Sequence, residues 1–320
     1  MSVPEARRKS QLLVGILLAG SLLAAGAVGG EAPLPVKATA KSEVGPAASD
    51  DWFVWSRSRE RDVSPFDLYA QRRGGRAFRV NKRGQAYGGG IAGNRLLFQL
   101  LRGHIFIQSD LRLYDLAARR QLRLPTGVNT KGWECCGTIS GDWILFSRGR
   151  GYSRERQLVL LRNLVTGEQR TLDTLRNSNG LLSAGQLNGT FAVWARCDPY
   201  PRCVVIRYDI ATGLATPLAT ATGKVAYSPS VGPSGTAYYV RSNKGCGKSV
   251  ELVKQTLIGP PEVLAALPAG RDVDITYANT VAPKPPGEVI TTEVYFDRTI
   301  CRKKTWDIYR VDDVQRAPPP

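Results

Sequence analysis

Short apolar segments recur along this chain, each followed by a polar turn, at intervals of about 45 residues. Typical examples are Leu-Tyr-Asp at 113–115 and Arg-Tyr-Asp at 207–209. Six such positions can be aligned, with spacings of 45, 48, 46, 45 and 56 residues: Tyr69, Tyr114, Arg162, Tyr208, Val253 and Tyr309. A repeat of this length that holds several short strands is typical of a β-propeller.

A second pattern repeats in phase with the first. Turns at Gly93, Gly141, Gly189 and Gly235 each lead into an apolar run that contains an aromatic residue. Glycine supplies the positive φ that tight hairpin turns need, and a continuous apolar run is typical of a strand buried on both sides. Each repeat therefore predicts a meander of four strands, a to d. The predicted fold class is all-β, a six-bladed β-propeller of four-stranded antiparallel blades.

The fifth repeat carries a family resemblance. The segment Pro229-Ser-Val-Gly-Pro-Ser-Gly-Thr-Ala-Tyr-Tyr-Val-Arg-Ser is similar to the repeat of TolB-like propellers, in which a Ser-Pro-Asp-Gly turn leads into an aromatic strand. Asp307-Ile-Tyr and Asp67-Leu-Tyr resemble the strand that follows in the same repeat. The resemblance covers residues 51–313 and implies the fold and an exported location. The α/β domain that precedes the propeller in TolB itself has no room in this chain.

The N-terminal 30 residues have the composition of a targeting segment. Arg7, Arg8 and Lys9 precede an apolar run at 12–30, which contains the small-residue pattern Ala25-Gly-Ala27. A positive region, an apolar stretch and small residues predict a secretory signal peptide. The run is also long enough to cross a bilayer, so an uncleaved membrane anchor remains an alternative.

These features divide the chain into three parts. Residues 1–30 are the signal peptide or anchor, 31–50 read as a linker, and 51–320 form the propeller. The sixth repeat ends in a Pro-rich tail, so its outer strand is predicted to come from residues 34–40. The expected location is the periplasm or the extracellular space, or the outer face of the cytoplasmic membrane if the anchor is retained.

Six cysteines in an exported chain predict disulfides. Cys197 and Cys203 flank one loop between strands b and c, and we predict that they close it. Cys246 and Cys301 lie in the b–c loops of the two following repeats, and they are predicted to bridge adjacent blades.

The remaining cysteines, Cys135 and Cys136, are neighbours in the sequence. They form either a vicinal disulfide or two thiols. The chain has no Cys-x-x-Cys pattern and a single histidine, His104, so we predict no metal site and no cofactor.

The b–c loops carry most of the positive charge. The chain has a net charge of +17, and these loops hold 17 Lys and Arg against five acidic residues. A face with one sign of charge attracts anions, and the planar arginine fork suits phosphate and carboxylate. We expect Arg148, Arg150, Arg154 and Arg156 to be surface side chains that can be replaced with little loss of stability. The candidates for an anionic-ligand face are Arg59, Arg61, Arg102, Arg148, Arg150, Arg154, Arg156, Arg202, Lys244, Lys248, Arg302, Lys303 and Lys304.

No catalytic motif stands out. The sequence lacks a Gly-x-Ser-x-Gly elbow and a phosphate-binding Gly-x-x-x-x-Gly-Lys loop. The predicted function is therefore a non-catalytic exported binding module that engages an anionic envelope polymer, a lipid surface or an acidic protein. We expect a monomer with no specific nucleic-acid partner, and membrane contact only through residues 12–30 if these are uncleaved.

Two other functions remain open. The first is a calcium-dependent six-bladed hydrolase or lactonase, which would need carboxylates directed at the propeller axis. The second is the ectodomain of a membrane-anchored sensor. A solvated basic surface without a ligand is the competing interpretation of the charged loops.

Overall fold

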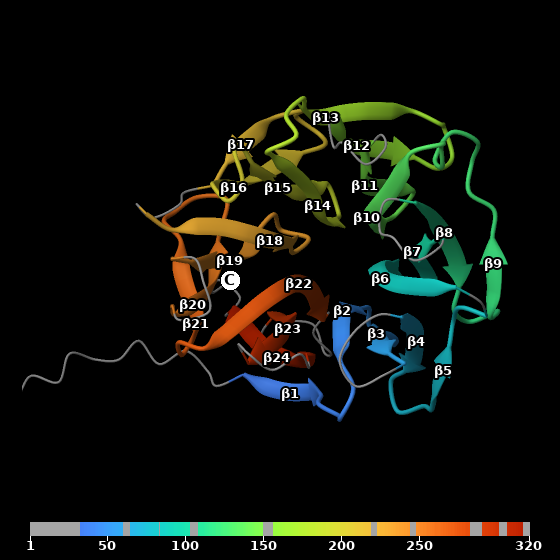
Figure 1. Cartoon of the computed structure of the whole chain (residues 1–320), viewed down its shortest axis with the longest axis horizontal. Helices are drawn as coiled ribbons and strands as arrows, with labels where there is room; N and C mark the ends of the chain where they lie inside the picture. The colour runs from blue at the N-terminus through green and yellow to red at the C-terminus, as the bar shows by residue number, and fades with distance from the viewer. Residues whose placement is uncertain are drawn as a thin grey trace, which may run out of the picture.

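Six antiparallel sheets of four strands each surround a central axis (Figure 1). The computed structural model describes residues 33–59, 65–82, 84–102, 108–149, 156–218, 223–243, 248–281, 290–300 and 306–315. The prediction of an all-β, six-bladed propeller is confirmed. Within the described residues every regular element is a β-strand.

Five blades are built from four consecutive strands, which follow one another from the axis to the rim. Blade one holds β2 (Glu43–Ala48), β3 (Trp52–Ser58), β4 (Phe66–Arg72) and β5 (Ala77–Arg79). Blade two holds β6 (Gln85–Ala92), β7 (Arg95–Leu101), β8 (Ser109–Asp115) and β9 (Arg120–Leu122). Blade three holds β10 (Trp133–Ser140), β11 (Trp143–Gly149), β12 (Gln157–Asn163) and β13 (Gln169–Leu175).

The remaining blades follow the same order, with one exception. Blade four holds β14 (Leu181–Asn188), β15 (Phe191–Cys197), β16 (Cys203–Asp209) and β17 (Ala215–Pro217). Blade five holds β18 (Val225–Val231), β19 (Ala237–Ser242), β20 (Val250–Gln255) and β21 (Glu262–Leu267). Blade six holds β22 (Arg271–Val281), β23 (Ile290–Ile300), β24 (Trp306–Gln315) and, as its outer strand, β1 (Leu34–Lys37).

The N-terminal strand closes the ring. β1 pairs antiparallel with β24, with Leu34 opposite Arg310, as predicted for residues 34–40. The reading of residues 31–50 as a linker was wrong, because this segment supplies both β1 and the inner strand β2. Its content of Pro, Ala, Lys and Ser predicted a linker, yet Gly45 and Pro46 lie at a β-bulge where Gly45 has a φ of 60°. The propeller therefore begins near Leu34 rather than at residue 51.

Aromatic side chains on the second strands fill the spaces between blades. Trp55, Phe146 and Trp194 are almost completely buried, as the apolar runs predicted. The turns before these strands use glycine in the left-handed region, for example Gly141 with a φ of 51°. The sheets therefore pack face to face around the axis, and each blade covers the apolar side chains of the next blade.

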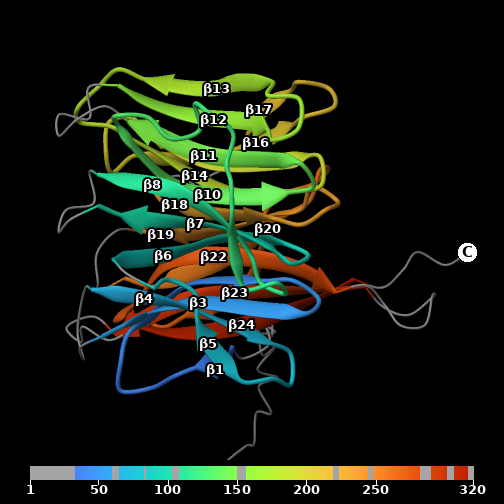
Figure 2. The ribbon, with the colours of Figure 1, turned by 90° about the vertical axis from the view of Figure 1, so that its right-hand side faces the viewer.

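The two faces of the disc differ in their connections. We call the face with the b–c loops and the blade-to-blade crossovers the loop face, and the face with the a–b and c–d turns the turn face. The strands of blade six, β22, β23 and β24, are 11, 11 and 10 residues long, longer than the other strands. They extend beyond the rest of the disc on the turn face (Figure 2).

Candidate ligand-binding face and the axis

Six of the predicted ligand-binding cations lie in the described residues, and all of them lie at the loop face. Arg59 and Arg102 directly follow β3 and β7, and Arg148 lies near the end of β11. Arg156, Arg202 and Lys248 lie just before the third strands of blades three, four and five. The other candidates lie outside the described residues: Arg61, Arg150, Arg154, Lys244, Arg302, Lys303 and Lys304.

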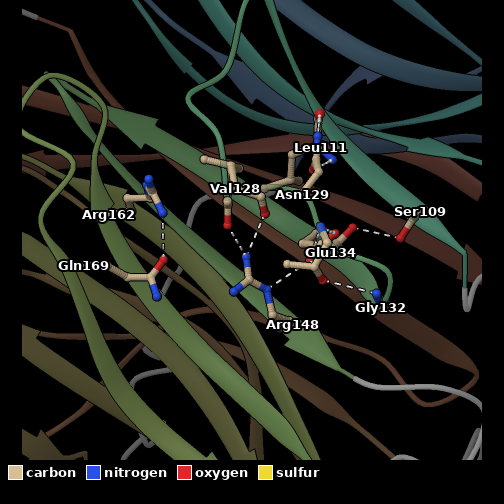
Figure 3. Close-up of polar contacts among 11 residues, drawn as sticks. Ser109, Leu111, Val128, Asn129, Gly132, Glu134, Arg148, Arg162 and Gln169 are labelled. Carbon is tan, nitrogen blue, oxygen red and sulfur yellow. Dashed lines mark hydrogen bonds and ion pairs between the residues drawn. The ribbon is translucent and has the colours of Figure 1, made fainter.

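Arg148 is part of the structure of blade three, contrary to the expectation that it is exposed. Its Nε donates to Oε1 of Glu134 at 2.9 Å, and its Nη2 donates to the carbonyl oxygens of Gly127 and Val128 at 2.8 Å each (Figure 3). The Arg148 side chain is 17% exposed, and that of Glu134 is 0% exposed. Thr130 also donates its hydroxyl to Glu134 Oε1 at 2.7 Å. This arginine therefore compensates a buried carboxylate and is not available to a ligand.

Blade one repeats the same arrangement. Glu43 accepts a hydrogen bond from the hydroxyl of Thr39 at 2.7 Å and from Nε of Arg57 at 3.0 Å. In both blades the threonine lies four residues before the glutamate and the arginine 14 residues after it. Glutamate and arginine are also direct cross-strand partners in both ladders. The spacing was visible in the sequence, but its meaning required the strand register.

Arg59 and Arg102 are paired with acids of the third strands. Nη2 of Arg59 donates to Asp67 at 2.8 Å, and Nε of Arg102 donates to Asp110 at 2.6 Å. Burial would raise the pKa of Asp67, but hydrogen bonds from Arg59 and Asn81 outweigh it and hold the pKa below its ordinary value. The count of loop charges did not include these strand acids, so the positive surplus available to a ligand is smaller than the loops alone predict.

Arg156, Arg202 and Lys248 remain as available cations. All three side chains are exposed, and none forms an ion pair within the described residues. They are 46 residues apart in each step. Arg156 and Arg202 directly precede β12 and β16, and Lys248 lies two residues before β20. The repeat thus places one exposed cation per blade along an arc of the loop face.

A disulfide fixes the loop of blade four. Cys197 and Cys203 are bonded, as predicted, and they join the end of β15 to the start of β16. Arg202 is the residue before Cys203, so the crosslink holds its backbone. Cys246 and Cys301 lie outside the described residues.

The vicinal cysteines Cys135 and Cys136 lie in β10, with Sγ atoms 2.7 Å apart and no disulfide between them. They are at a β-bulge that recurs in all six inner strands. The register shifts between Val44 and Ala47, Tyr87 and Gly90, Cys135 and Thr138, Ala184 and Leu187, Tyr227 and Ser230, and Val273 and Thr276. In blades one, three and five a bulge residue has a positive φ: Gly45 at 60°, Cys136 at 56° and Ser228 at 49°.

Small residues let the bulges of adjacent blades touch. A Cβ on Gly88 would lie 2.2 Å from the carbonyl oxygen of Gly45, and a Cβ on Gly185 would lie 2.4 Å from that of Pro229. The inner strands therefore pack backbone against backbone, which narrows the channel at the axis.

Two polar side chains cross this narrow channel. Nε2 of Gln186 in blade four donates to the carbonyl of Ala278 in blade six at 2.7 Å, and its Oε1 accepts from the amides of Ala278 at 2.9 Å and Val231 at 3.3 Å. The hydroxyl of Tyr277 donates to the carbonyl of Ile91 in blade two at 3.2 Å. Burial raises the pKa of Tyr277 to about 12. Sequence patterns gave no sign of either bridge, since one glutamine or tyrosine carries no periodic signal.

A cavity of about 310 Å³ lies above these bridges on the turn face, and its polar lining includes Ser49, Asp50, Asp51, Ser140, Asn188 and Asn279. Within the described part of the chain, no three His, Cys, Asp or Glu side chains are arranged to hold a metal ion. None of the described segments is a helix long and apolar enough to cross a membrane.

Comparison with known proteins gives likeness in fold. No protein-family model and no curated protein matches the chain. Among solved structures, the β-propeller domain of the Trilobed protease from Pyrococcus furiosus has a TM-score of 0.50 at 8% identity, with 89% of this chain and 97% of that chain covered. TolB from Acinetobacter baumannii has a TM-score of 0.46 at 12% identity, with 86% of this chain covered. This chain spans 64% of the length of that TolB.

An oligogalacturonate lyase in complex with manganese is similar at a TM-score of 0.46 and 10% identity, over 82% of this chain and 86% of that chain. All three identities are low, so these likenesses concern the fold alone. At the level of the fold, the predicted resemblance to TolB-like six-bladed propellers is confirmed by the six four-stranded blades.

Proposed function

We propose that this chain is a non-catalytic, exported propeller that binds an anionic partner across the loop face of blades three to five. The observation that carries the proposal is the arc of Arg156, Arg202 and Lys248, one exposed cation within two residues of the start of the third strand in each of three consecutive blades. An extended polymer with repeated phosphate or carboxylate groups can contact several such cations at once, as can an acidic segment of a protein.

Two further observations support the non-catalytic and exported parts of the proposal. The cavity at the axis is lined by two carboxylates, Asp50 and Asp51, but within the described residues no three His, Cys, Asp or Glu side chains are arranged to hold the calcium that a calcium-dependent propeller enzyme would need. The disulfide between Cys197 and Cys203 is typical of proteins that fold in an oxidising compartment.

The test measures binding of polyphosphate and polyglutamate to the purified chain and to the variant Arg156→Ser/Arg202→Ser/Lys248→Ser. We expect the triple variant to bind about tenfold more weakly or worse, because each exposed cation contributes up to about 1 kcal/mol, and we expect binding to weaken as salt rises.

The matched control is Arg72→Ser/Arg76→Ser/Arg120→Ser, which removes the same charge from three exposed arginines on the turn face. Equal losses of affinity in the two variants would show that binding depends only on the net charge of the chain, and this would contradict the proposal. A calcium-dependent ester or lactone hydrolysis by the purified chain would contradict its non-catalytic part.

A further inference from the structure

The loop between β15 and β16 is tightly held on the loop face of blade four. The disulfide between Cys197 and Cys203 closes the base of this loop. Within it, the amide of Arg202 donates to the carbonyl of Pro199 at 2.8 Å, and the amide of Asp198 donates to the carbonyl of Arg202 at 3.1 Å. The crosslink and these hydrogen bonds leave the loop little conformational freedom.

Tyr200 lies at the tip of this loop and is 63% exposed. Its amide donates to the carbonyl of Asn179, at 2.8 Å, in the crossover from blade three. From the same crossover, the side chain of Asn177 donates to Asp198 at 3.0 Å. The backbone that carries the ring is therefore ordered before any partner arrives. A rigid aromatic side chain on an ordered support loses little entropy on binding, which suits it to recognition.

Two exposed arginines leave blade three next to each other. The ladder of β12 and β13 ends with Gln157 opposite Leu175, so Arg156 and Arg176 are the next residues on the two strands. Both are exposed, and neither forms an ion pair within the described residues. Like charges at opposite places on neighbouring strands repel each other, and an anion bound by both arginines relieves this repulsion. Arg176 was not among the predicted cations, because it lies in a crossover rather than in a b–c loop.

One crossover connects the arginine pair to the tyrosine. Arg176 directly precedes Asn177, whose side chain contacts the loop of blade four. The next two residues, Ser178 and Asn179, are exposed. This part of the loop face therefore combines two arginines, hydroxyl and amide groups, and the ring of Tyr200.

The combination fits a charged sugar chain better than a protein. One face of a pyranose ring consists of C–H bonds that pack on an aromatic ring, and the hydroxyl groups around it form hydrogen bonds with side chains such as Ser178 and Asn179. A stable protein interface needs an apolar patch at its centre. Among the large hydrophobic residues of the described part of the chain, Tyr200 is the one that is exposed on this face.

We infer that the anionic partner is an acidic polysaccharide, an inference that rests on the proposed function and names its substrate class. A sugar ring packs on Tyr200. Carboxylate or sulfate groups on neighbouring sugars bind Arg202 and the pair of Arg156 and Arg176, since the arginine fork suits such planar or multiple acceptors.

The first experiment separates the sugar ring from the charge. Alginate and polyglutamate each carry one carboxylate per unit, but only alginate has sugar rings. Titration calorimetry measures the binding of chains of equal length to the purified protein with its disulfide intact. We expect alginate to bind about fivefold more tightly, which is the size of one aromatic contact.

Equal affinities for the two polymers, or binding of polyglutamate alone, would overturn the inference while the proposed function stands. A chain that binds neither these polymers nor polyphosphate would contradict the proposed function as well.

The second experiment removes the ring. Tyr200→Ala should lower the affinity for alginate about fivefold and leave the affinity for polyglutamate unchanged, whereas Tyr200→Phe should bind alginate as the parent chain does. The matched control is Leu214→Ala on the turn face of the same blade, where Leu214 is 64% exposed. This control should not change binding. Equal losses for the two polymers in Tyr200→Ala would overturn the inference and would indicate an acidic protein as the partner.

The third experiment tests the arginine pair. Arg176→Ser should lower the affinity for both polymers about threefold, the size of one exposed ion pair, while the melting temperature does not fall, because a repulsion is removed. The matched control is Arg76→Ser, which removes an exposed arginine from the turn face. An unchanged affinity for alginate in Arg176→Ser, or equal losses in the two variants, would overturn the inference. Melting curves of every variant establish that the propeller is intact.

Discussion

The loop face contains two groups of cations that look alike in the sequence and differ in the structure. The strand group, Arg57 and Arg148, lies within the second strands and compensates the buried carboxylates Glu43 and Glu134. The loop group, Arg156, Arg202 and Lys248, is exposed and has no ion pair within the described residues. The difference shows that the charge of a loop region cannot be counted apart from the strands beneath it.

The physical reason lies in the environment of the acids. A carboxylate inside a sheet is stable as an anion only if a cation and hydrogen bonds replace its lost water. Glu134 is fully buried, so the arginine opposite to it in the ladder is committed to that role. Arg156, Arg202 and Lys248 face water, and no carboxylate of the described residues pairs with them.

The largest expected effect is on stability, from Arg148→Ala. The substitution leaves Glu134 buried without its cation and the carbonyls of Gly127 and Val128 without a donor. We expect the free energy of unfolding to fall by about 3 kcal/mol or more, as when one partner of a buried pair is removed. Denaturation with guanidinium chloride measures this value.

The matched control for this comparison is Arg156→Ala, on the same blade and face. Its free energy of unfolding should stay within about 0.5 kcal/mol of the parent chain, as is usual for an exposed residue. Similar losses from the two substitutions would show that the two groups do not differ.

The fold was largely predictable from the sequence, because the same strand and turn pattern occurs in every repeat. The six-fold spacing, the Gly turns and the aromatic strands gave the blades, and the missing outer strand of the last repeat pointed to residues 34–40. The inner strand β2 was missed because residues 31–50 are rich in Pro, Ala, Lys and Ser, which is typical of a linker, while Gly45 and Pro46 form a bulge beside Gly88.

The candidate site was less predictable, because pairing across strands decides which cations are available. The sequence placed Arg148 and Arg156 in one basic loop, eight residues apart. Only the ladder register shows that Arg148 lies opposite Glu134, whereas Arg156 precedes β12 and faces solvent. The axial bridges of Gln186 and Tyr277 depend on contacts between blades that are far apart in the sequence.

The next largest effect is expected on acidification. Asp67 and Glu293 are buried and Glu251 is half-buried, and burial alone would raise their pKa values. Hydrogen bonds from Arg59 to Asp67, from Lys224 to Glu251 and from Arg73 to Glu293, with other partners, hold each pKa below its ordinary value instead. A carboxyl group whose pKa is lower in the folded state stabilises the fold above its unfolded pKa of about 4, and the contribution is lost as pH falls through the folded value.

These groups should therefore have little effect on the melting temperature between pH 7 and about pH 5. Below about pH 4 the melting temperature should fall steeply. Glu293→Gln should make that fall shallower, since one of the three groups no longer titrates. A melting temperature that stays constant down to about pH 3 would show that these ion pairs do not stabilise the fold.

A smaller effect is expected from Arg57→Ala in blade one. Arg57 binds Glu43 through one hydrogen bond at 3.0 Å and is more exposed than Arg148. Lys37 is also near. Its pKa is lowered by burial and by Arg57, while Glu43 acts in the opposite direction. Without Arg57, Lys37 can compensate Glu43 in part, so we expect a loss of about 1–2 kcal/mol in the free energy of unfolding.

The double variant Lys37→Met/Arg57→Ala tests this explanation. If Lys37 takes over part of the role, the double variant should lose more stability than the two single variants together. Simple additivity would mean that the environment of Glu43 does not depend on Lys37, and the smaller effect would need another cause.

The smallest effect on stability is expected from the loop group. Arg156→Ser, Arg202→Ser and Lys248→Ser should each leave the free energy of unfolding within about 0.5 kcal/mol of the parent. Each should lower the affinity for polyphosphate by about twofold to fivefold, the size of one exposed ion pair, and the three effects should add, because the cations lie on different blades. Titration calorimetry at two salt concentrations measures the affinities, and denaturation with guanidinium chloride measures the stabilities. If one of the three substitutions accounts for the whole loss, the partner contacts a single blade, and the repeated spacing of these cations has no part in binding.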